Sequence, residues 1–329
     1  MVSKKPISLT PVLAADYYEH LLRELPKATT RIVIASMVVM WGKKTSVVFD
    51  MLLAAVKRGV QVHVLLDSYT RWPLMPFDPS QPRSTRLSRT FSLLENLQAR
   101  GATLHYVRRS SINPYRGHCH VKITVIDNTF YSFGGTNMYD ENLVITDYML
   151  AGRSVAGADC LQQLVERIST NKKILPDAEL ELTHDHTILF DGGQPKSSLI
   201  YERACELSTQ ATKIYYVSQC APSGYLGEIL QSTNADCYMN RPDQMVAPDG
   251  WGQAFDQQRY RTANLYKRAT YIHAKFMLFE FAGGRRALLS GSNNFSYRGV
   301  AYGTQEIAVY SHDRALWQQL YRLLEKYIA

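Results

Sequence analysis

Two short runs of this sequence place a histidine and a lysine at the same spacing. His120 and Lys122 stand in one apolar run, and His273 and Lys275 stand in another. On a β-strand, residues two apart point to the same face of the sheet, so each pair would face one way. A buried lysine requires an anion or an acceptor, and an imidazole exchanges protons near neutral pH. Two such pairs predict one shared site for an anionic group.

A run of small residues ending in asparagine follows each pair. The runs are Gly134, Gly135, Thr136 and Asn137 in the first half and Ser290, Gly291, Ser292 and Asn293 in the second. Small residues allow the backbone to approach a ligand closely, and the two asparagines offer amide donors.

The surrounding elements recur in the same order in both halves of the chain. The matching segments are 29–39 and 211–221, 46–59 and 224–234, 104–110 and 264–270, and 120–127 and 273–280. The first and last segments have the apolar, β-branched character of buried strands, and the second has helical periodicity. Strands alternating with helices predict an α/β sandwich in each half, related by internal duplication.

The two copies differ in length and are joined by a polar segment. The charged, turn-rich stretch from Ser169 to Ser198 predicts a boundary near residue 180, with lobes at 1–180 and 181–329. The first copy has a longer interval before its histidine, and we assign most of the excess to a loop from Ser68 to Thr90. Loops of this length are often lids or binding loops.

Composition excludes several classes of protein. The 329 residues are 46% hydrophobic and 20% charged, as in globular proteins. No apolar run is long enough to cross a bilayer, the N-terminus does not resemble a secretory signal, and we expect a cytoplasmic protein. The five cysteines lack the spacing of a zinc site, and neither a metal nor another cofactor is expected. The net charge of +8 favours an anionic partner.

The motifs together resemble those of the phospholipase D superfamily. The first copy reads His-x-Lys, four residues, Asp127, six residues and Gly-Gly-x-Asn, and the second copy resembles its partner. The resemblance is strongest to the two-motif cardiolipin synthase and phosphatidylserine synthase type. It implies a bilobal α/β fold with one active site at the interface between the lobes.

The resemblance also implies a role for each residue of the site. One histidine attacks phosphorus to give a phosphohistidine, and the other protonates the leaving alcohol; by analogy His120 is the nucleophile and His273 the acid/base. The two lysines and two asparagines would hold the non-bridging oxygens. The acids Asp147 and Glu306 match the positions that orient the histidines, and we assign Asp147 to His120 and Glu306 to His273.

The second copy departs from the family pattern at one acid. Glu280 replaces the aspartate expected where the first copy has Asp127. We expect the acid at this place to have a structural role.

The substrate is left open by these residues. We favour a phospholipid headgroup, with peripheral contact to the inner face of a membrane through the basic surface and the tip of the long loop around Trp72 and Phe77. The alternative is a metal-independent nuclease acting on DNA or RNA, and a third reading is a binding module without turnover. The oligomeric state is not indicated.

Overall fold

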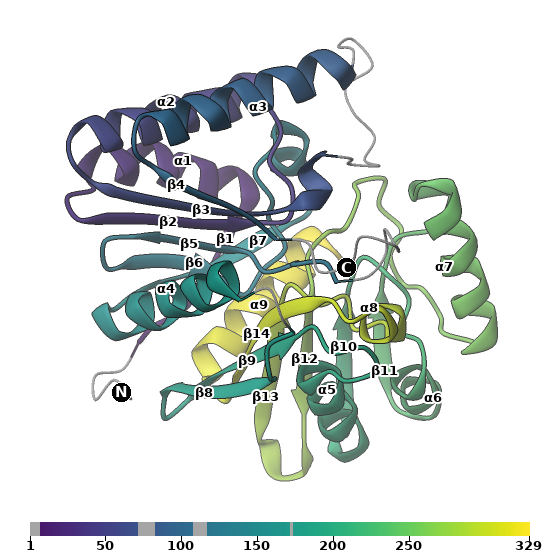
Figure 1. Cartoon of the computed structure of the whole chain (residues 1–329). Coiled ribbons are helices and arrows are strands. Elements are labelled where there is room, and N and C mark those ends of the chain that lie inside the picture. The colour runs from purple at the N-terminus through teal and green to yellow at the C-terminus, as the bar shows by residue number, and fades with distance from the viewer. Residues whose placement is uncertain (1–6, 72–82, 108–116, 172–173) are drawn as a thin grey trace.

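The computed structural model describes residues 7–71, 83–107, 117–171 and 174–329. Over these residues the chain forms two lobes, each built on one seven-stranded mixed sheet (Figure 1). The prediction of two α/β sandwich lobes is confirmed. The proposed membrane tip at Trp72–Phe77 lies outside the described residues.

The first lobe contains the first sheet, in the order β1-β7-β6-β5-β2-β3-β4. Its strands are β1 (Thr10–Leu13), β2 (Arg31–Ser36), β3 (Gln61–Asp67), β4 (Thr103–Val107), β5 (Ile123–Ile126), β6 (Thr129–Ser132) and β7 (Tyr148–Arg153). Its helices are α1 (Ala14–Glu24), α2 (Lys43–Lys57), α3 (Arg83–Ala99) and α4 (Val155–Thr170), with 3-10 turns η1 (Leu25–Lys27), η2 (Ser68–Arg71) and η3 (Asp140–Val144).

The second lobe contains the second sheet, in the order β11-β10-β12-β13-β14-β9-β8. Its strands are β8 (Ala178–Thr183), β9 (His186–Gly192), β10 (Lys213–Val217), β11 (Ala235–Tyr238), β12 (Phe276–Glu280), β13 (Arg286–Gly291) and β14 (Gln305–Ser311). Its helices are α5 (Leu199–Gln210), α6 (Tyr225–Ser232), α7 (Ala247–Arg259), α8 (Tyr297–Tyr302) and α9 (Arg314–Tyr327), with 3-10 turns η4 (Pro242–Gln244) and η5 (Ala282–Gly284).

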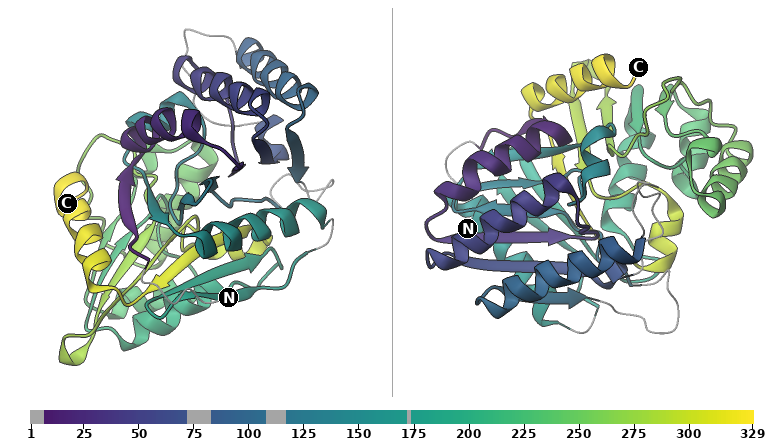
Figure 2. Two further views of the ribbon diagram at one scale, coloured as in Figure 1. Left: turned by 90° about the vertical axis from the view of Figure 1, so that its left-hand side faces the viewer. Right: turned by 90° about the horizontal axis from the view of Figure 1, so that it is seen from above.

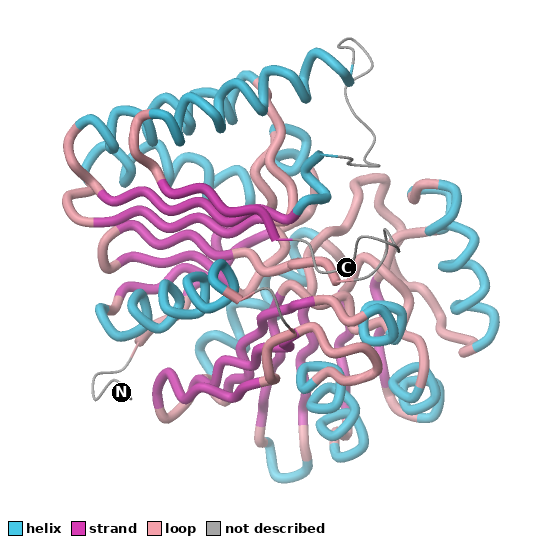
Figure 3. Tube along the Cα trace, viewed as in Figure 1, coloured by secondary structure: helices cyan, strands magenta, loops and turns pink. Residues whose placement is uncertain are grey.

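Alternation along the strands explains why each sheet is covered on both faces. In β2, Ile32 and Ile34 pack under α1 and α2, whereas Val33 and Ala35 pack into the core that the two lobes share. Because successive strand residues point to opposite faces, a fully apolar strand requires a layer on each side. Figure 3 shows these helical layers beside the magenta strands.

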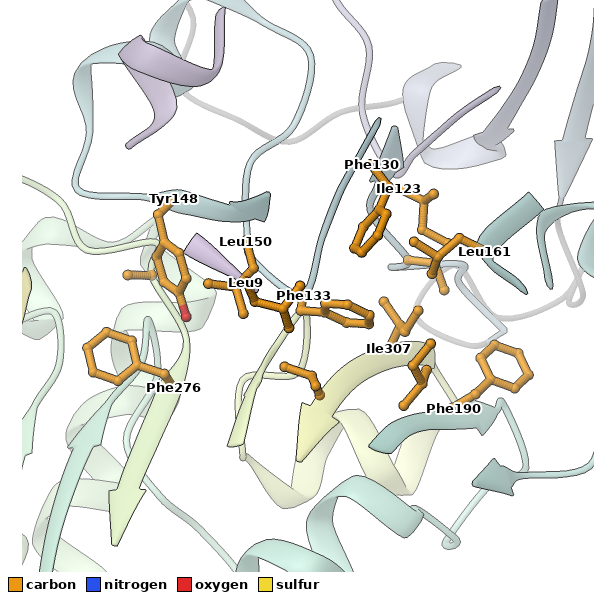
Figure 4. Close-up of a cluster of buried hydrophobic side chains, with 14 of the residues drawn as sticks. Leu9, Ile123, Phe130, Phe133, Tyr148, Leu150, Leu161, Phe190, Phe276 and Ile307 are labelled. Atoms are coloured by element: carbon orange, nitrogen blue, oxygen red, sulfur yellow. The ribbon is translucent and has the colours of Figure 1, made fainter. Parts of the chain in front are cut away.

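The core shared by the lobes lies between their sheets. α4 contributes Leu161 and α9 contributes Leu320 to a cluster that also contains residues from β5, β6, β9 and β14. In Figure 4, Phe133 of the first lobe lies beside Ile307 of the second. A common apolar core of this kind holds the lobes in a fixed arrangement. Figure 2 shows the two lobes from two further sides.

Three sequence predictions differ from the structure. Residues 83–90, predicted as loop, are the first turns of α3; the inward face of this helix begins with the polar residues Arg86 and Thr90, so it lacks an apolar signal. Segments 104–110 and 264–270, which match in sequence, differ in structure: the first begins within β4, whereas the second has only an isolated bridge between Cys237 and Asn264. The stretch 169–198 contains the β8–β9 hairpin, so the predicted boundary near residue 180 falls within β8.

Candidate active site at the seam between the lobes

The histidine and lysine pairs lie where the two lobes meet. His120 and Lys122 lie just before β5, and His273 and Lys275 lie just before β12, rather than inside the strands as predicted. The backbone N–H of His120 donates to the carbonyl of Gln305 over 2.9 Å, and that of His273 donates to Thr146 over 2.9 Å. Each histidine segment is therefore fastened to the opposite lobe.

The acids are exchanged between the lobes. Nδ1 of His120 lies 3.0 Å from Oε2 of Glu306, and Nδ1 of His273 lies 2.8 Å from Oδ2 of Asp147. The sequence assignment of Asp147 to His120 and Glu306 to His273 was wrong. The physical reason for the difference is the backbone pairing between the lobes. Parallel bridges join Cys119 to Gln305 and Thr146 to Ile272, so each histidine lies beside the acid of the other lobe. A histidine held through Nδ1 presents Nε2 as its reactive nitrogen.

Both histidines are kept neutral by their surroundings. Burial lowers the pKa of His120, and Glu306 opposes this only in part. Burial and the nearby Lys275 lower the pKa of His273 to about 4, against the opposing effect of Asp147. A neutral imidazole with a carboxylate on Nδ1 has its lone pair on Nε2, which is the form required for nucleophilic attack.

The two acids are ionised although they are buried. Burial acts to raise the pKa of Asp147, but His273 and Lys275 outweigh it and the pKa is lowered. Burial likewise acts to raise the pKa of Glu306, but His120 and Lys122 outweigh it and the pKa is lowered. Each carboxylate is therefore a fixed negative charge behind one imidazole.

The two lysines are the buried cations of the site. Lys122 is 1% exposed and Lys275 is 0% exposed. Their ammonium groups donate to the carbonyl oxygens of His120 and His273, over 2.8 Å and 2.5 Å. Burial lowers the pKa of Lys122 to about 7 and that of Lys275 to about 8. An anion bound beside them would stabilise their protonated forms.

The four groups act on one another across the seam. Lys275 lowers the pKa of His120, and Lys122 lowers the pKa of His273, so each lysine acts on the histidine of the other lobe. Interactions of this kind require proximity, because Coulomb energy falls with distance. The predicted pairs thus form one polar cluster.

The asparagines of the small-residue turns are buried beside the motif. Asn137 is 5% exposed and Asn293 is 3% exposed. Oδ1 of Asn293 accepts the N–H of Phe295 over 2.6 Å. Among the described residues Oδ1 of Asn137 has no hydrogen-bond partner. A buried amide with an unpaired oxygen is available to a ligand. The contact of the two asparagine side chains with a phosphate stays a prediction.

The turns place backbone close to the acids and histidines. A Cβ at Gly135 would overlap the carbonyl of His273 and lie 2.6 Å from Oδ1 of Asp147. One at Gly134 would overlap the carbonyl of Tyr148, and one at Gly291 would lie 2.5 Å from that of Ile307. Only glycine leaves room for these approaches.

Ser290 joins the two turns across the seam. Its hydroxyl donates to the carbonyl of Phe133 over 2.6 Å and lies 2.5 Å from the hydroxyl of Tyr148. The residue therefore links β13 of the second lobe to β6 and β7 of the first.

The terminal acids of the motifs lie at the far ends of their strands. Asp127 accepts the backbone N–H groups of Thr29, Thr30 and Arg31 and fastens the β5–β6 turn to the start of β2. Glu280 forms an ion pair of 2.8 Å with Arg286 across the β12–β13 hairpin. Both contacts hold the strands together away from the histidines.

Sequence reasoning missed the residues that support the acids. The amide of Asn142 donates to Oδ2 of Asp147 over 2.9 Å, and the hydroxyl of Ser292 donates to Glu306. Ser292 lies inside the Ser-Gly-Ser-Asn run, so its position was a usable signal. Asn142 lies in η3, outside any recurring motif, and nothing in the sequence pointed to it.

Two further residues occupy equivalent places in the lobes and were also missed. Asp67, the last residue of β3, accepts the N–H of Cys119 over 2.6 Å. Asn240, two residues after β11, accepts the N–H of Ile272 over 2.7 Å. Each fixes the residue before a motif histidine. Their matched positions after the corresponding strands of the repeat could have identified them.

Asp67 also faces an imidazole, which Asn240 does not. Nδ1 of His118 lies 3.0 Å from Oδ1 of Asp67. His118 is thereby a neighbour of the site in the first lobe. Across the described segments, no group of three or more His, Cys, Asp or Glu side chains is arranged to hold a metal ion.

Comparison with known proteins identifies the fold. Residues 21–151 match the family model described as cardiolipin synthase, PLD-like domain. Phosphatidylserine synthase from Haemophilus influenzae has a similar structure, with a TM-score of 0.74 and 11% sequence identity over 100% of this chain and 88% of that one. No curated protein matches in sequence.

Two other solved structures share the arrangement at lower similarity. Polyphosphate kinase from Porphyromonas gingivalis has a TM-score of 0.61 and 12% identity, over 97% of this chain and 50% of that one. The yeast tyrosyl-DNA phosphodiesterase has a TM-score of 0.50 and 12% identity, over 93% and 90% of the two chains. At these identities the likeness shows the fold alone. The predicted resemblance is confirmed at this level: residues 21–151 match the cardiolipin synthase, PLD-like domain, and the whole chain has the fold of phosphatidylserine synthase.

Proposed function

We propose that this protein cleaves or transfers phosphodiesters of phospholipids through a phosphohistidine intermediate. The observation that carries the proposal is the crossed arrangement of the seam. One histidine from each lobe is held through Nδ1 by an acid of the other lobe, and two buried lysines complete the cluster. This arrangement provides two reactive imidazoles and fixed positive charge for one anionic substrate.

The charge balance of the cluster favours a phosphodiester. With both lysines protonated, their two charges balance those of Asp147 and Glu306, and the two histidines are neutral. A phosphodiester brings one further negative charge. The bound anion raises the pKa of both imidazoles, and a proton on one of them restores neutrality. Substrate binding therefore supplies the general acid that the free protein lacks.

The reaction then proceeds in two displacements. Nε2 of His120 attacks phosphorus, the bond from phosphorus to the leaving oxygen breaks, and protonated His273 gives its Nε2 proton to that oxygen. In the second step neutral His273 removes the proton of water or an alcohol, the new oxygen–phosphorus bond forms, and the bond to His120 breaks. The same protein groups serve both steps, so His273 alternates between acid and base.

The acids have different tasks in this scheme. Glu306 fixes the Nδ1 proton of His120, so that the Nε2 lone pair faces phosphorus. Asp147 stabilises the imidazolium of His273 each time that residue takes a proton. Lys122 and Lys275, with the amides of Asn137 and Asn293, would hold the oxygens of the five-coordinate transition state.

One observation supports phospholipid as the substrate, and the charge of the chain is compatible with it. The matching family model is named for cardiolipin synthase. The net charge of +8 favours approach to an anionic bilayer, although it would equally favour a nucleic acid. No helix within the described ranges is long and apolar enough to span a membrane. In our proposal the reaction takes place at the surface of a bilayer, on its inner, cytoplasmic face.

The substrate is tested by incubating the protein with phosphatidylglycerol vesicles and, in parallel, with single- and double-stranded DNA in the presence of a chelator. We expect phosphatidic acid or cardiolipin from the vesicles, lost in His120→Ala and His273→Ala. The matched control is His184→Ala, which changes an exposed histidine of the β8–β9 hairpin. Cleaved DNA with unchanged lipid would instead identify the nuclease alternative.

A further inference from the structure

Helix α7 of the second lobe has its polar and apolar faces reversed. Its inward face contains Gln253, 2% exposed, and Asp256, 7% exposed. Its outward face contains Trp251, 75% exposed, and Phe255, 60% exposed. These aromatic residues are four apart and share one side of the helix. Surface helices normally bury the apolar side, so this orientation requires a reason.

The inward face is held by specific hydrogen bonds. Oε1 of Gln253 accepts the N–H of Ala221 over 2.7 Å, and Nε2 donates to the carbonyl of Asn240 over 2.8 Å. Asp256 accepts from Arg298 over 2.5 Å. Rotating the helix to bury its aromatics would leave these polar groups unpaired in the interior, which is unfavourable. The outward position of Trp251 and Phe255 is therefore built into the fold.

Other apolar side chains extend the exposed face. Val246, the N-cap of α7, and Leu265, which follows the helix, are each 43% exposed. Isolated exposed apolar residues are ordinary in soluble proteins. Two aromatics on one side of a helix, with aliphatic residues before and after, form a surface that gains stability when water is removed from it.

Basic residues follow this apolar surface. Arg259 and Arg261 lie at the C-terminal end of α7, and Lys267 and Arg268 lie in the next segment, all four exposed. The amide of Gln244, in η4 before α7, donates to the carbonyl of Arg268 over 3.3 Å, so this segment passes close to the beginning of the helix. Cations thus lie near both ends of α7. Asp249 in its first turn is also exposed, and the guanidinium of Arg268 donates to the carbonyls of Lys326 and Ala329. The carboxylate of Asp256 is engaged inward.

α7 occupies the outer margin of the second lobe and is also tied to the active site. Figures 1 and 2 show it at the edge of the molecule, beyond α6 and α8. Its contact Asn240 bonds both backbone groups of Ile272, the residue before His273. A surface that binds the outer face of α7 would therefore be held at a fixed distance from the reactive histidine.

We infer that the outward face of α7 binds the surface of an anionic phospholipid bilayer. Trp251 and Phe255 would enter the boundary between headgroups and acyl chains, and Arg259, Arg261 and Lys267 would contact lipid phosphates. The inference rests on the proposed function, because it names the surface from which the lipid substrate would be taken. It commits to a membrane, and not to a second copy of the chain or another protein.

The test is sedimentation of the 329-residue chain with vesicles of phosphatidylglycerol and of phosphatidylcholine. We expect binding to phosphatidylglycerol, and at least a roughly tenfold loss of affinity in the double variant Trp251→Ser/Phe255→Ser. The control Val47→Ser/Val155→Ser changes exposed apolar residues on helices of the first lobe and should bind as the wild type does. Hydrolysis of a water-soluble phosphodiester should be unchanged in both variants, which shows that they are folded.

Several outcomes would overturn the inference. The wild type failing to bind phosphatidylglycerol vesicles would do so, as would equal binding by the double variant. A dimeric wild type with a monomeric double variant would assign the surface to self-association instead. The proposed function fails by a different result. If the protein binds vesicles through Trp251 and Phe255 but does not turn over any lipid, the role of α7 stands and phospholipid is not the substrate.

Discussion

The two lobes are built alike and differ where they meet. β2, β5, β6 and β7 of the first sheet correspond in order to β10, β12, β13 and β14 of the second. At the seam, however, Asp147 corresponds to Glu306 and Asp67 to Asn240. The shared order provides two histidines, and the substitutions around them make their surroundings unequal.

The strand beside each acid differs as well. Glu306 pairs in register with Asp191 of β9, whereas the carbonyl of Asp147 accepts the N–H of Ala14, the first residue of α1. The buried carboxyl of Asp191 therefore lies next to the acid of the second lobe. A duplicated site therefore does not require equivalent halves. Each lobe supplies the acid that holds the histidine of the other, and two histidines with different tasks benefit from different neighbours.

Exchanging the acids for amides should have the largest effect. We expect Glu306→Gln and Asp147→Asn each to lower kcat by about 10² to 10⁴, because an amide does not stabilise the imidazolium or fix the required tautomer. Nitrogen NMR of the histidines should show a lowered pKa for His120 in Glu306→Gln and for His273 in Asp147→Asn.

The NMR response decides the crossed pairing independently of activity. The exposed Glu95→Gln change on α3 is the matched control and should move neither histidine. If Glu306→Gln perturbed only His273, the acids would be paired within each lobe and the crossed arrangement would be wrong.

Removing the residues that fasten the histidine segments should have an intermediate effect. Asp67→Ala and Asn240→Ala each take away the acceptor for one backbone N–H next to a motif histidine. We expect roughly a tenfold loss in kcat with a smaller change in KM, because the histidine would be displaced while binding groups stay in place.

The conservative variant Asp67→Asn separates positioning from charge. It keeps an acceptor for Cys119 but not the carboxylate beside His118. Recovery of most of kcat in Asp67→Asn would show that the hydrogen bond matters, and loss equal to that of Asp67→Ala would refute the positioning role. Asp50→Ala, an exposed change on α2, is the control.

The buried carboxyl of the second lobe should make stability depend on pH. Burial raises the pKa of Asp191 to about 8 in the folded protein, far above its ordinary value of about 4. The folded state therefore holds this proton more tightly than the unfolded state. The stabilisation is present at low pH and is lost as pH rises towards 8, with a slope of up to about 1.4 kcal/mol per pH unit.

Urea unfolding of the wild type and Asp191→Asn between pH 5 and 8 measures this slope. The variant should lose this part of the pH dependence, while Asp185→Asn in the exposed β8–β9 turn should retain it. Identical slopes for the wild type and Asp191→Asn would contradict the assignment.

Much of the fold followed from the repeat. The strands at β2 and β10, the helices at α2 and α6 and the two motifs were predicted because apolar periodicity and motif order were both duplicated. α3 was predicted in part as loop, since its buried face begins with Arg86, which forms an ion pair with Glu141 that no periodicity reveals. The β8–β9 hairpin was missed because alternating glutamates concealed its apolar side.

The crossed pairing could not be predicted from the sequence. A repeat aligns Asp147 with Glu306 and His120 with His273, but it contains no information on which copy contacts which. That choice depends on how the lobes dock through their shared core, where residues such as Phe133 and Ile307 come from opposite halves. The orientation of α7 was hidden for a related reason: its buried face is polar.

The central claim is that two histidines from different lobes act on one phosphorus atom. It is tested most directly by trapping the intermediate with a diester that has a good leaving group, quenching, and locating the phosphorylated residue by mass spectrometry. We predict an adduct on His120 that accumulates in His273→Ala, where no base activates the acceptor, and is absent in His120→Ala. Full turnover in either variant, or turnover without a histidine adduct, would contradict the account.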